Sequence, residues 1–112
     1  MVWIDGWGLI YGLGPIDLVN TSVPLPESIE EQTRKIVRNL DAILKDRQLS
    51  RRHVVAVRAH LIDFQNLRER FQNAWSELFP ADENSFAMSC VGVSALARGS
   101  QVEMDFTVRE TR

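Results

Sequence analysis

The sequence predicts an α+β domain in which two helices cover one face of a single mixed sheet. Two stretches, residues 28–47 and residues 66–79, carry apolar side chains at helical spacing. Residues 102–108 instead alternate strictly between apolar and polar side chains, as a half-buried strand does. Further short apolar runs lie before and between the helical stretches, so the expected order is β(β)αβαββ in one domain, 1–112.

The N-terminal part is expected to hold two strands and a loop. Residues 8–13 form an apolar run bounded by glycines, which is most simply a buried strand, and residues 2–4 form another. Asp5-Gly6 between them is a hairpin signal, although Trp7 makes the spacing imperfect. Residues 14–27 hold three of the four prolines and are predicted to be a loop.

The first helix has the clearest boundaries. Ser28 followed by Glu31 is a capping-box pattern, and Lys45 with Arg47 places positive charge in the last turn. The second helix is expected to open at Asn66 and to end before Pro80. Both helices carry an apolar stripe at helical spacing. In the first helix the stripe consists of Ile29, Ile36, Val37, Leu40, Ile43 and Leu44, and in the second of Leu67, Phe71, Ala74, Trp75 and Leu78.

Three strands are expected in the rest of the chain, at His53–Ile62, Phe86–Val93 and Val102–Val108, with a polar loop at 81–85 and a turn at Arg98-Gly99. In the first of them Val55, Val57, Ala59 and Leu61 share one face and Arg58 and His60 the other. Strand–helix–strand connections imply parallel pairs with right-handed crossovers.

The alternation also implies that the helices cover only one face of the sheet. The residues assigned to the uncovered face are His60, Met88, Cys90 and Glu103, a set too mixed for ordinary solvated surface. We therefore expect the protein to associate with copies of itself.

Composition excludes several classes of function. Thirteen Lys and Arg residues against 15 Asp and Glu residues give a formal charge of −2, which argues against nucleic-acid binding. One cysteine excludes an internal disulfide framework and a multi-cysteine zinc site, and no metal site is expected. No apolar stretch is long enough to cross a membrane, and the start lacks the basic region of a signal peptide. The expected location is the cytoplasm.

Three segments resemble the RidA/YjgF family. Residues 86–105, FAMSCVGVSALARGSQVEMD, are similar to the family signature P-A-R-S-C-V-x-V-x-x-L-P-x-G-x-x-V-E-I-E. Residues 31–40, EQTRKIVRNL, resemble its Q-T-R-x-x-x-x-N-L helix, and residues 53–63 resemble its V-V-x-V-x-x-x-L-x-D strand. The likeness extends over about residues 8–110.

This resemblance implies a chorismate-mutase-like fold and a homotrimer, with the sheets lining its inside and small-molecule clefts between subunits. Active members hydrolyse reactive 2-imino acids, such as 2-iminobutanoate and 2-iminopropanoate, to 2-keto acids and ammonia. They need no metal or organic cofactor, so none is expected here.

When the family's cleft residues are matched to this sequence position by position, several of them are missing. Met88 stands where the family has the arginine that binds the substrate carboxylate, and a thioether supplies neither charge nor a hydrogen-bond donor. Cys90 retains the cleft cysteine, and Glu103 retains the glutamate thought to position the hydrolytic water. The segment that supplies a tyrosine is absent, and Tyr11-Gly-Leu-Gly14 lacks the serine of the matching strand end.

Other readings of these residues stay open. Arg58 either replaces the missing cation or forms an ion pair with Glu103 or Asp105, and Glu103 is either a cleft residue or part of a subunit contact. Whether the protein is an enzyme is likewise open. The alternatives to an imine or enamine deaminase are a non-enzymatic trimer that binds a metabolite or a partner protein and, least favoured by the charge, a ribonuclease or translation inhibitor.

Overall fold

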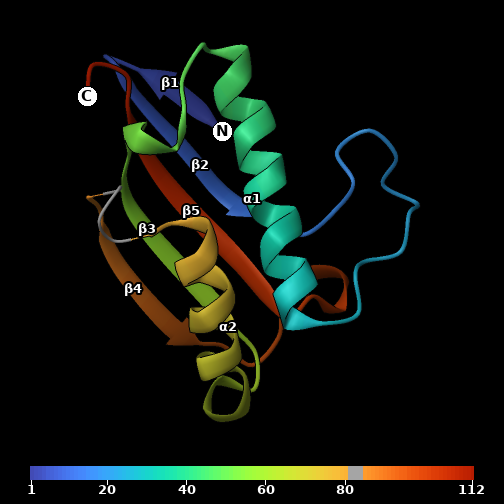
Figure 1. The fold of residues 1–112 in the computed structure, drawn as a ribbon. Coiled ribbons are helices and arrows are strands. Elements are labelled where there is room, and N and C mark those ends of the chain that lie inside the picture. The colour runs from blue at the N-terminus through green and yellow to red at the C-terminus, as the bar shows by residue number, and fades with distance from the viewer. Residues whose placement is uncertain (81–84) are drawn as a thin grey trace.

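The computed structural model describes residues 1–80 and 85–112, and its elements follow the predicted order (Figure 1). The strands are β1 (Val2–Ile4), β2 (Trp7–Leu13), β3 (Val54–Leu61), β4 (Ala87–Gly92) and β5 (Val102–Arg109). The helices are α1 (Ile29–Asp46) and α2 (Phe64–Leu78), with short 3-10 turns at Arg51–His53 and Ala97–Gly99. The α+β class is confirmed. Of the polar loop predicted at 81–85, all but Ser85 lies outside the described residues.

The strands form one mixed sheet in the order β1-β2-β5-β3-β4. Only β3 and β4, which α2 connects, pair in parallel. The parallel pair expected across α1 is wrong, because β5 lies between β2 and β3 and is antiparallel to both. A crossover determines the direction of the next strand, but a strand that comes later in the chain can still insert between the two.

Both helices lie on the same face of this sheet (Figure 1). As predicted, Val102, Met104, Phe106 and Val108 of β5 are fully buried beneath them, and the residues between these four are only half buried. The helices therefore cover one face, and none of the described helices covers the other, the open face. No helix in the described parts of the chain is long and apolar enough to cross a membrane.

Helix α1 begins where its cap predicts. The hydroxyl of Ser28 accepts a hydrogen bond from the Glu31 main-chain N–H at 3.1 Å. Two buried polar side chains hold the preceding loop. Asn39 Nδ2 donates to the carbonyl oxygens of Gly14 and Ile16 at 3.1 and 2.8 Å, and Gln32 Nε2 donates to that of Pro26 at 2.8 Å.

Helix α2 begins at Phe64, two residues before the predicted start at Asn66. Asp63 takes the cap position in a left-handed conformation, and its carboxylate accepts a hydrogen bond from Asn66 Nδ2 at 2.9 Å. At the other end of the helix, Trp75 stacks on Phe79 with ring centroids 4.4 Å apart, and Phe86 meets both rings edge-on. This aromatic cluster fixes which face of β4 points toward α2.

The hairpin between β1 and β2 is a regular two-residue turn. Asp5 and Gly6 both have positive φ, 52° and 80°, and Ile4 pairs directly with Trp7, so the spacing that looked imperfect is correct. The strand predicted at residues 8–13 is confirmed, but it is buried on one side only, because Ile10 is 2% exposed and Tyr11 is 57% exposed. An antiparallel strand beside a half-covered sheet buries only alternate side chains.

The predicted assignment of β3 residues to the two faces of the sheet is also wrong at the start of the strand. Val54 is buried and Val55 only half buried, because the pairing with β5 is irregular between Val54 and Ala56. From Val57 onward the predicted alternation is confirmed. Arg58 and His60 lie on the open face, and Ala59 and Leu61 lie in the core.

Candidate functional site

The open face carries most of the polar side chains of the central strands. Strand pairing places Arg58 of β3 beside Asp105 of β5, and His60 beside Glu103. Because paired residues of neighbouring strands point to the same side of a sheet, these four side chains form one polar surface. The prediction that His60 and Glu103 share the uncovered face is confirmed.

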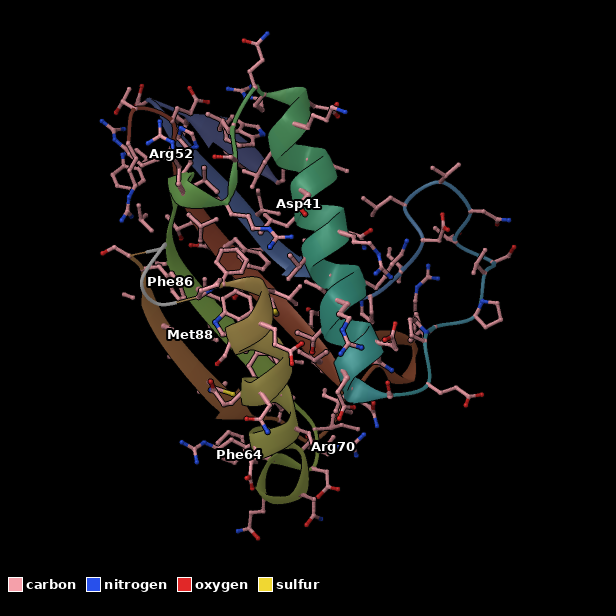
Figure 2. The ribbon with its side chains drawn as sticks, viewed as in Figure 1. Asp41, Arg52, Phe64, Arg70, Phe86 and Met88 are labelled. Atoms are coloured by element: carbon pink, nitrogen blue, oxygen red, sulfur yellow. The ribbon has the colours of Figure 1, made fainter. Side chains whose placement is uncertain are left out.

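Met88 and Cys90 lie on the opposite face, which corrects the prediction that they belong to the uncovered one. They pair with Val57 and Ala59, which are both buried, and they pack against the core as half-buried side chains. Figure 2, which looks onto the helix-covered face, shows Phe86 and Met88 beside α2. Phe86 determines which β4 residues face the helix. Its contact with the aromatic cluster turns every second residue that follows it, Met88 and Cys90 among them, toward α2.

The thiol of Cys90 is not activated. Burial raises its pKa above the usual value, and the positive charge of Arg68 opposes this effect only in part. The thiol is therefore protonated at neutral pH, and a protonated thiol is a poor nucleophile. This favours the interpretation of Cys90 as a small apolar lining residue.

Glu103 is half buried, and its carboxylate makes no hydrogen bond or ion pair within the described part of the chain. A Cβ atom added to Gly12 of β2 would lie 3.4 Å from Glu103 Oε1, so the glycine leaves space beside the carboxylate. His60 Nδ1 lies 3.3 Å from the main-chain oxygen of Glu103. A carboxylate with free lone pairs can accept a proton from water or orient it.

Arg58 does not pair with either predicted carboxylate in this chain. Its Nε donates to Ser89 Oγ at 3.2 Å, and no acidic side chain among the described residues lies within 4 Å of the guanidinium. Asp105 instead accepts a hydrogen bond from the Gly12 main-chain N–H at 2.8 Å and lies 4.0 Å from His60 Nε2. Within the described ranges, no three His, Cys, Asp or Glu side chains gather as a potential metal site.

A hollow of about 410 Å³ opens on this face. Its lining comes from Tyr11 of β2, from Ala56 and Arg58 of β3, from Ala87 and Ser89 of β4, and from Asp105 and Thr107 of β5, with Val57 and Met88 between them. Tyr11 Oη and Thr107 Oγ1 lie 3.3 Å apart at its margin. The volume falls within the usual range for small-molecule sites.

Of these lining residues, sequence reasoning singled out Arg58 and Met88 as binding residues. Asp105 and Thr107 could have been found, because the alternation of residues 102–108 places them on the face of Glu103. Ser89 was missed because the face of β4 was assigned the wrong way round. The sequence does not single out Tyr11, because its strand is predicted to be buried and the exposed side of that strand is not anticipated.

Comparison with known proteins agrees with the fold. The family model described as Endoribonuclease L-PSP matches residues 2–110. A RutC family protein of Aquifex aeolicus is 28% identical over 98 residues, covering 88% of this chain and 78% of that protein. A protein of Lactococcus lactis described as a putative regulator AldR is 30% identical over 100 residues, with 88% and 76% covered.

Solved structures give the same result. The chain is similar to yeast Mmf1 with a TM-score of 0.83 at 26% identity, covering 96% of this chain and 82% of that one. It is similar to YyfA of Yersinia pestis, described as a conserved Rid family protein of unknown function, with a TM-score of 0.84 at 27% identity and the same coverage. With a family model matched over nearly its whole length, this chain belongs to the RidA/YjgF family, also called the endoribonuclease L-PSP family.

Proposed function

We propose that this protein is a homotrimer that binds a small imine or enamine in clefts between its subunits and hydrolyses it. The observation that carries the proposal is the Glu103 carboxylate, which stands unpaired within the described residues on a sheet face that its own helices leave open. Imine hydrolysis adds the oxygen of water to the C=N carbon and releases the nitrogen as ammonia, leaving a carbonyl group. Glu103 would take a proton from the water and return it to the departing nitrogen.

The positions of the candidate residues favour a cleft shared between subunits. Met88 and Cys90 lie on the helix side of β4, whereas Glu103 lies on the open face of β5. Met88 also lines the hollow on the open face, but Cys90 and Glu103 do not, so the three residues do not surround that hollow within one chain. Since β4 is an edge strand, a neighbouring copy can lie against it and supply its own Glu103 to the cleft.

Met88 argues for a substrate without a carboxylate. The cleft lacks the arginine that would form a bidentate pair with a 2-imino acid, and a half-buried thioether is an apolar surface. We therefore expect a neutral imine or enamine to be the better substrate.

The test compares two imines generated in situ. 2-Iminopropanoate is released from alanine by an amino acid oxidase, and propan-1-imine from propylamine by a flavin amine oxidase. The wild-type protein should accelerate hydrolysis of the neutral imine more, and Glu103→Gln should reduce both rates by about 100-fold or more. Met88→Arg should raise the rate with 2-iminopropanoate, while Glu69→Gln, an exposed change on α2, should leave both rates unaltered.

The second candidate is a trimer that binds a metabolite without reacting with it, and Met88 favours this as well. An equal rate of imine loss with and without wild-type protein would remove the enzymatic proposal. The second candidate then predicts that a small neutral ligand raises the melting temperature at saturating concentration. A ribonuclease is disfavoured by the net charge of −2.

A further inference from the structure

His60 of β3 lies directly beside Glu103 of β5 on the open face. The two are paired residues of neighbouring strands, and both are half buried. The His60 side chain is 24% exposed, so part of its ring faces the space outside the sheet. Histidine is the side chain best suited to give and take a proton near neutral pH. Since imine hydrolysis moves protons on both the water and the nitrogen, His60 is a candidate for the second proton carrier.

The main chain of β5 determines which ring nitrogen of His60 carries a hydrogen. His60 Nδ1 lies 3.3 Å from the carbonyl oxygen of Glu103. A carbonyl oxygen can only accept a hydrogen bond, so in this contact Nδ1 carries the hydrogen and donates it. Nε2 is then the nitrogen that gains or loses a proton, because the bond made by one ring nitrogen sets the role of the other.

Charged groups surround His60 Nε2 on the open face. Asp105 Oδ2 lies 4.0 Å from Nε2, and Glu103 brings a second carboxylate from the same strand. Arg58, two residues along β3 on the same face, is the nearby positive charge. On the side of β4 the paired residue is Val91, which carries no charge. A positively charged imidazole ring therefore has two opposite charges beside it and one like charge.

Glu103 and His60 lie close together without forming an ion pair. Within the described part of the chain, neither ring nitrogen of His60 lies within 4 Å of the Glu103 carboxylate. That carboxylate has Oε1 beside Gly12 of β2, whereas the His60 ring approaches β5 from the other side, on β3. Both groups are therefore free to act on different atoms of one small molecule, as a general base and a general acid must.

We propose that His60 is the general acid of the hydrolysis, an inference that rests on the function proposed above. In the first step Glu103 takes a proton from water, whose oxygen bonds to the imine carbon. At the same time His60 Nε2 gives its proton to the nitrogen, and the C=N double bond becomes a single bond. In the second step the hydroxyl proton passes to Nε2 and Glu103 gives its proton to the nitrogen. The C–N bond breaks, ammonia leaves a carbonyl group behind, and both residues return to their starting states.

A general acid matters most for the neutral imine that Met88 favours. Water attacks a C=N carbon readily only when the nitrogen gains a proton, and a neutral imine has to obtain that proton from its surroundings. In the shared cleft, the copy that supplies Glu103 also supplies His60, because the two residues lie on the same face of one chain.

The pH dependence of propan-1-imine hydrolysis tests this role, with the amine oxidase in excess and the uncatalysed rate subtracted. The kcat of the wild type should fall in acid as Glu103 gains a proton and in alkali as His60 loses one. His60→Asn keeps an N–H for the Glu103 carbonyl but cannot titrate. Its kcat should be about 100-fold lower, and the alkaline fall should disappear.

Asp105→Asn tests the charge beside Nε2. The Gly12 main-chain N–H donates to Asp105 Oδ1 at 2.8 Å, and an asparagine oxygen can still accept that bond. Because the substitution removes a negative charge 4.0 Å from Nε2, the alkaline fall should move lower by about 0.5–1 pH unit.

His53→Gln is the matched control, because His53 is the other histidine of the chain. Its Nδ1 accepts a hydrogen bond from the Ser50 main-chain N–H at 3.1 Å, and a glutamine oxygen can accept the same bond. The shape of its pH profile should equal that of the wild type. Nitrogen NMR of the free protein adds a measurement that does not depend on activity, since neutral His60 should carry its hydrogen on Nδ1.

His60→Asn that keeps the wild-type kcat or the alkaline fall overturns the inference, and so does a neutral His60 ring protonated on Nε2. In both cases an inactive Glu103→Gln leaves the proposed hydrolysis standing. A wild-type protein that does not accelerate imine loss overturns the hydrolysis and the role of His60 together. If circular dichroism shows that His60→Asn does not fold, Asp105→Asn and the ring spectrum decide the question.

Discussion

At the scale of single residues, Gly8 shows how one missing side chain shapes the hairpin. A Cβ atom at Gly8 would lie 2.3 Å from Cζ3 of the Trp3 ring, far inside contact distance. The glycine therefore lets the Trp3 ring lie flat across β2, where the Arg47 guanidinium covers it at 4.3 Å from the ring centroid. No pattern in the sequence indicates this contact, because it joins residues on two strands to the residue that follows α1.

We expect Gly8→Ala to destabilise the protein by about 1–3 kcal/mol, because the added methyl group must displace the Trp3 ring. Gly14→Ala is the matched control, since nothing lies within 4 Å of its added Cβ. Both changes reduce the entropy of the unfolded chain similarly, so urea unfolding of the two variants isolates the steric cost. Equal stability of the two variants would mean that the ring moves aside freely.

At the scale of elements, the two helices are joined at their exposed edges by an ion pair. Arg70 of α2, labelled in Figure 2, donates to both carboxylate oxygens of Glu30. Glu30 lies in the first turn of α1, and the two donor–acceptor distances are 2.9 and 2.7 Å. The hydrogen bond from Arg70 lowers the pKa of Glu30 from 4.5 to about 2. Since the folded state holds this carboxylate ionised, the pair stabilises the fold above the unfolded pKa.

This contribution should be lost as the pH falls from about 4.5 toward about 2, because in this range Glu30 of the unfolded chain gains a proton while Glu30 of the folded protein stays ionised. The wild type should therefore have a higher melting temperature than Glu30→Gln at neutral pH. This difference in melting temperature should disappear in acid. The difference should be small, since both side chains are partly exposed and screened by solvent. Glu69→Gln, a change at an exposed position on α2, should show no such pH dependence, and a Glu30 carboxyl that titrates normally by NMR would contradict the assignment.

At the scale of the whole molecule, the open face also has an apolar corner. Ile4 and Trp7 are paired residues of the hairpin, and they are 57% and 41% exposed. Val2 and Tyr11 extend this corner at 53% and 57% exposure. Apolar side chains gathered on one uncovered sheet face are expected where another protein surface packs, and the proposed trimer assigns that surface to sister copies.

Ile4→Glu should therefore weaken the assembly, because it would bury a charge in the contact between copies. Light scattering should give the trimer mass for the wild type and a lower mass for the variant, while circular dichroism shows an unchanged fold. Val19→Glu adds the same charge at a loop position that is 98% exposed, and it should remain a trimer. A wild-type protein that runs as a stable monomer would contradict the proposed assembly.

Local sequence patterns were sufficient to predict the helices and strands and to place part of the candidate site. The Ser28 cap, the stripe of α1 and the alternation of β5 each follow from neighbours within a few residues, so the structure agrees with them. The same alternation placed Glu103 on the uncovered face. Such patterns depend on helical and strand periodicity, which every chain segment carries in its own sequence.

Only the tertiary structure determined which strands lie next to each other and which side chains of β4 face α2. Nothing in residues 86–93 distinguishes one apolar face from the other, and only the packing of Phe86 against Trp75 and Phe79 turns Met88 and Cys90 toward α2. Likewise, the hollow exists because β4, β3 and β5 bring together Ser89, Arg58 and Asp105, which lie far apart along the chain. Periodicity is local, whereas the pairing of strands and the packing of rings depend on contacts between distant segments.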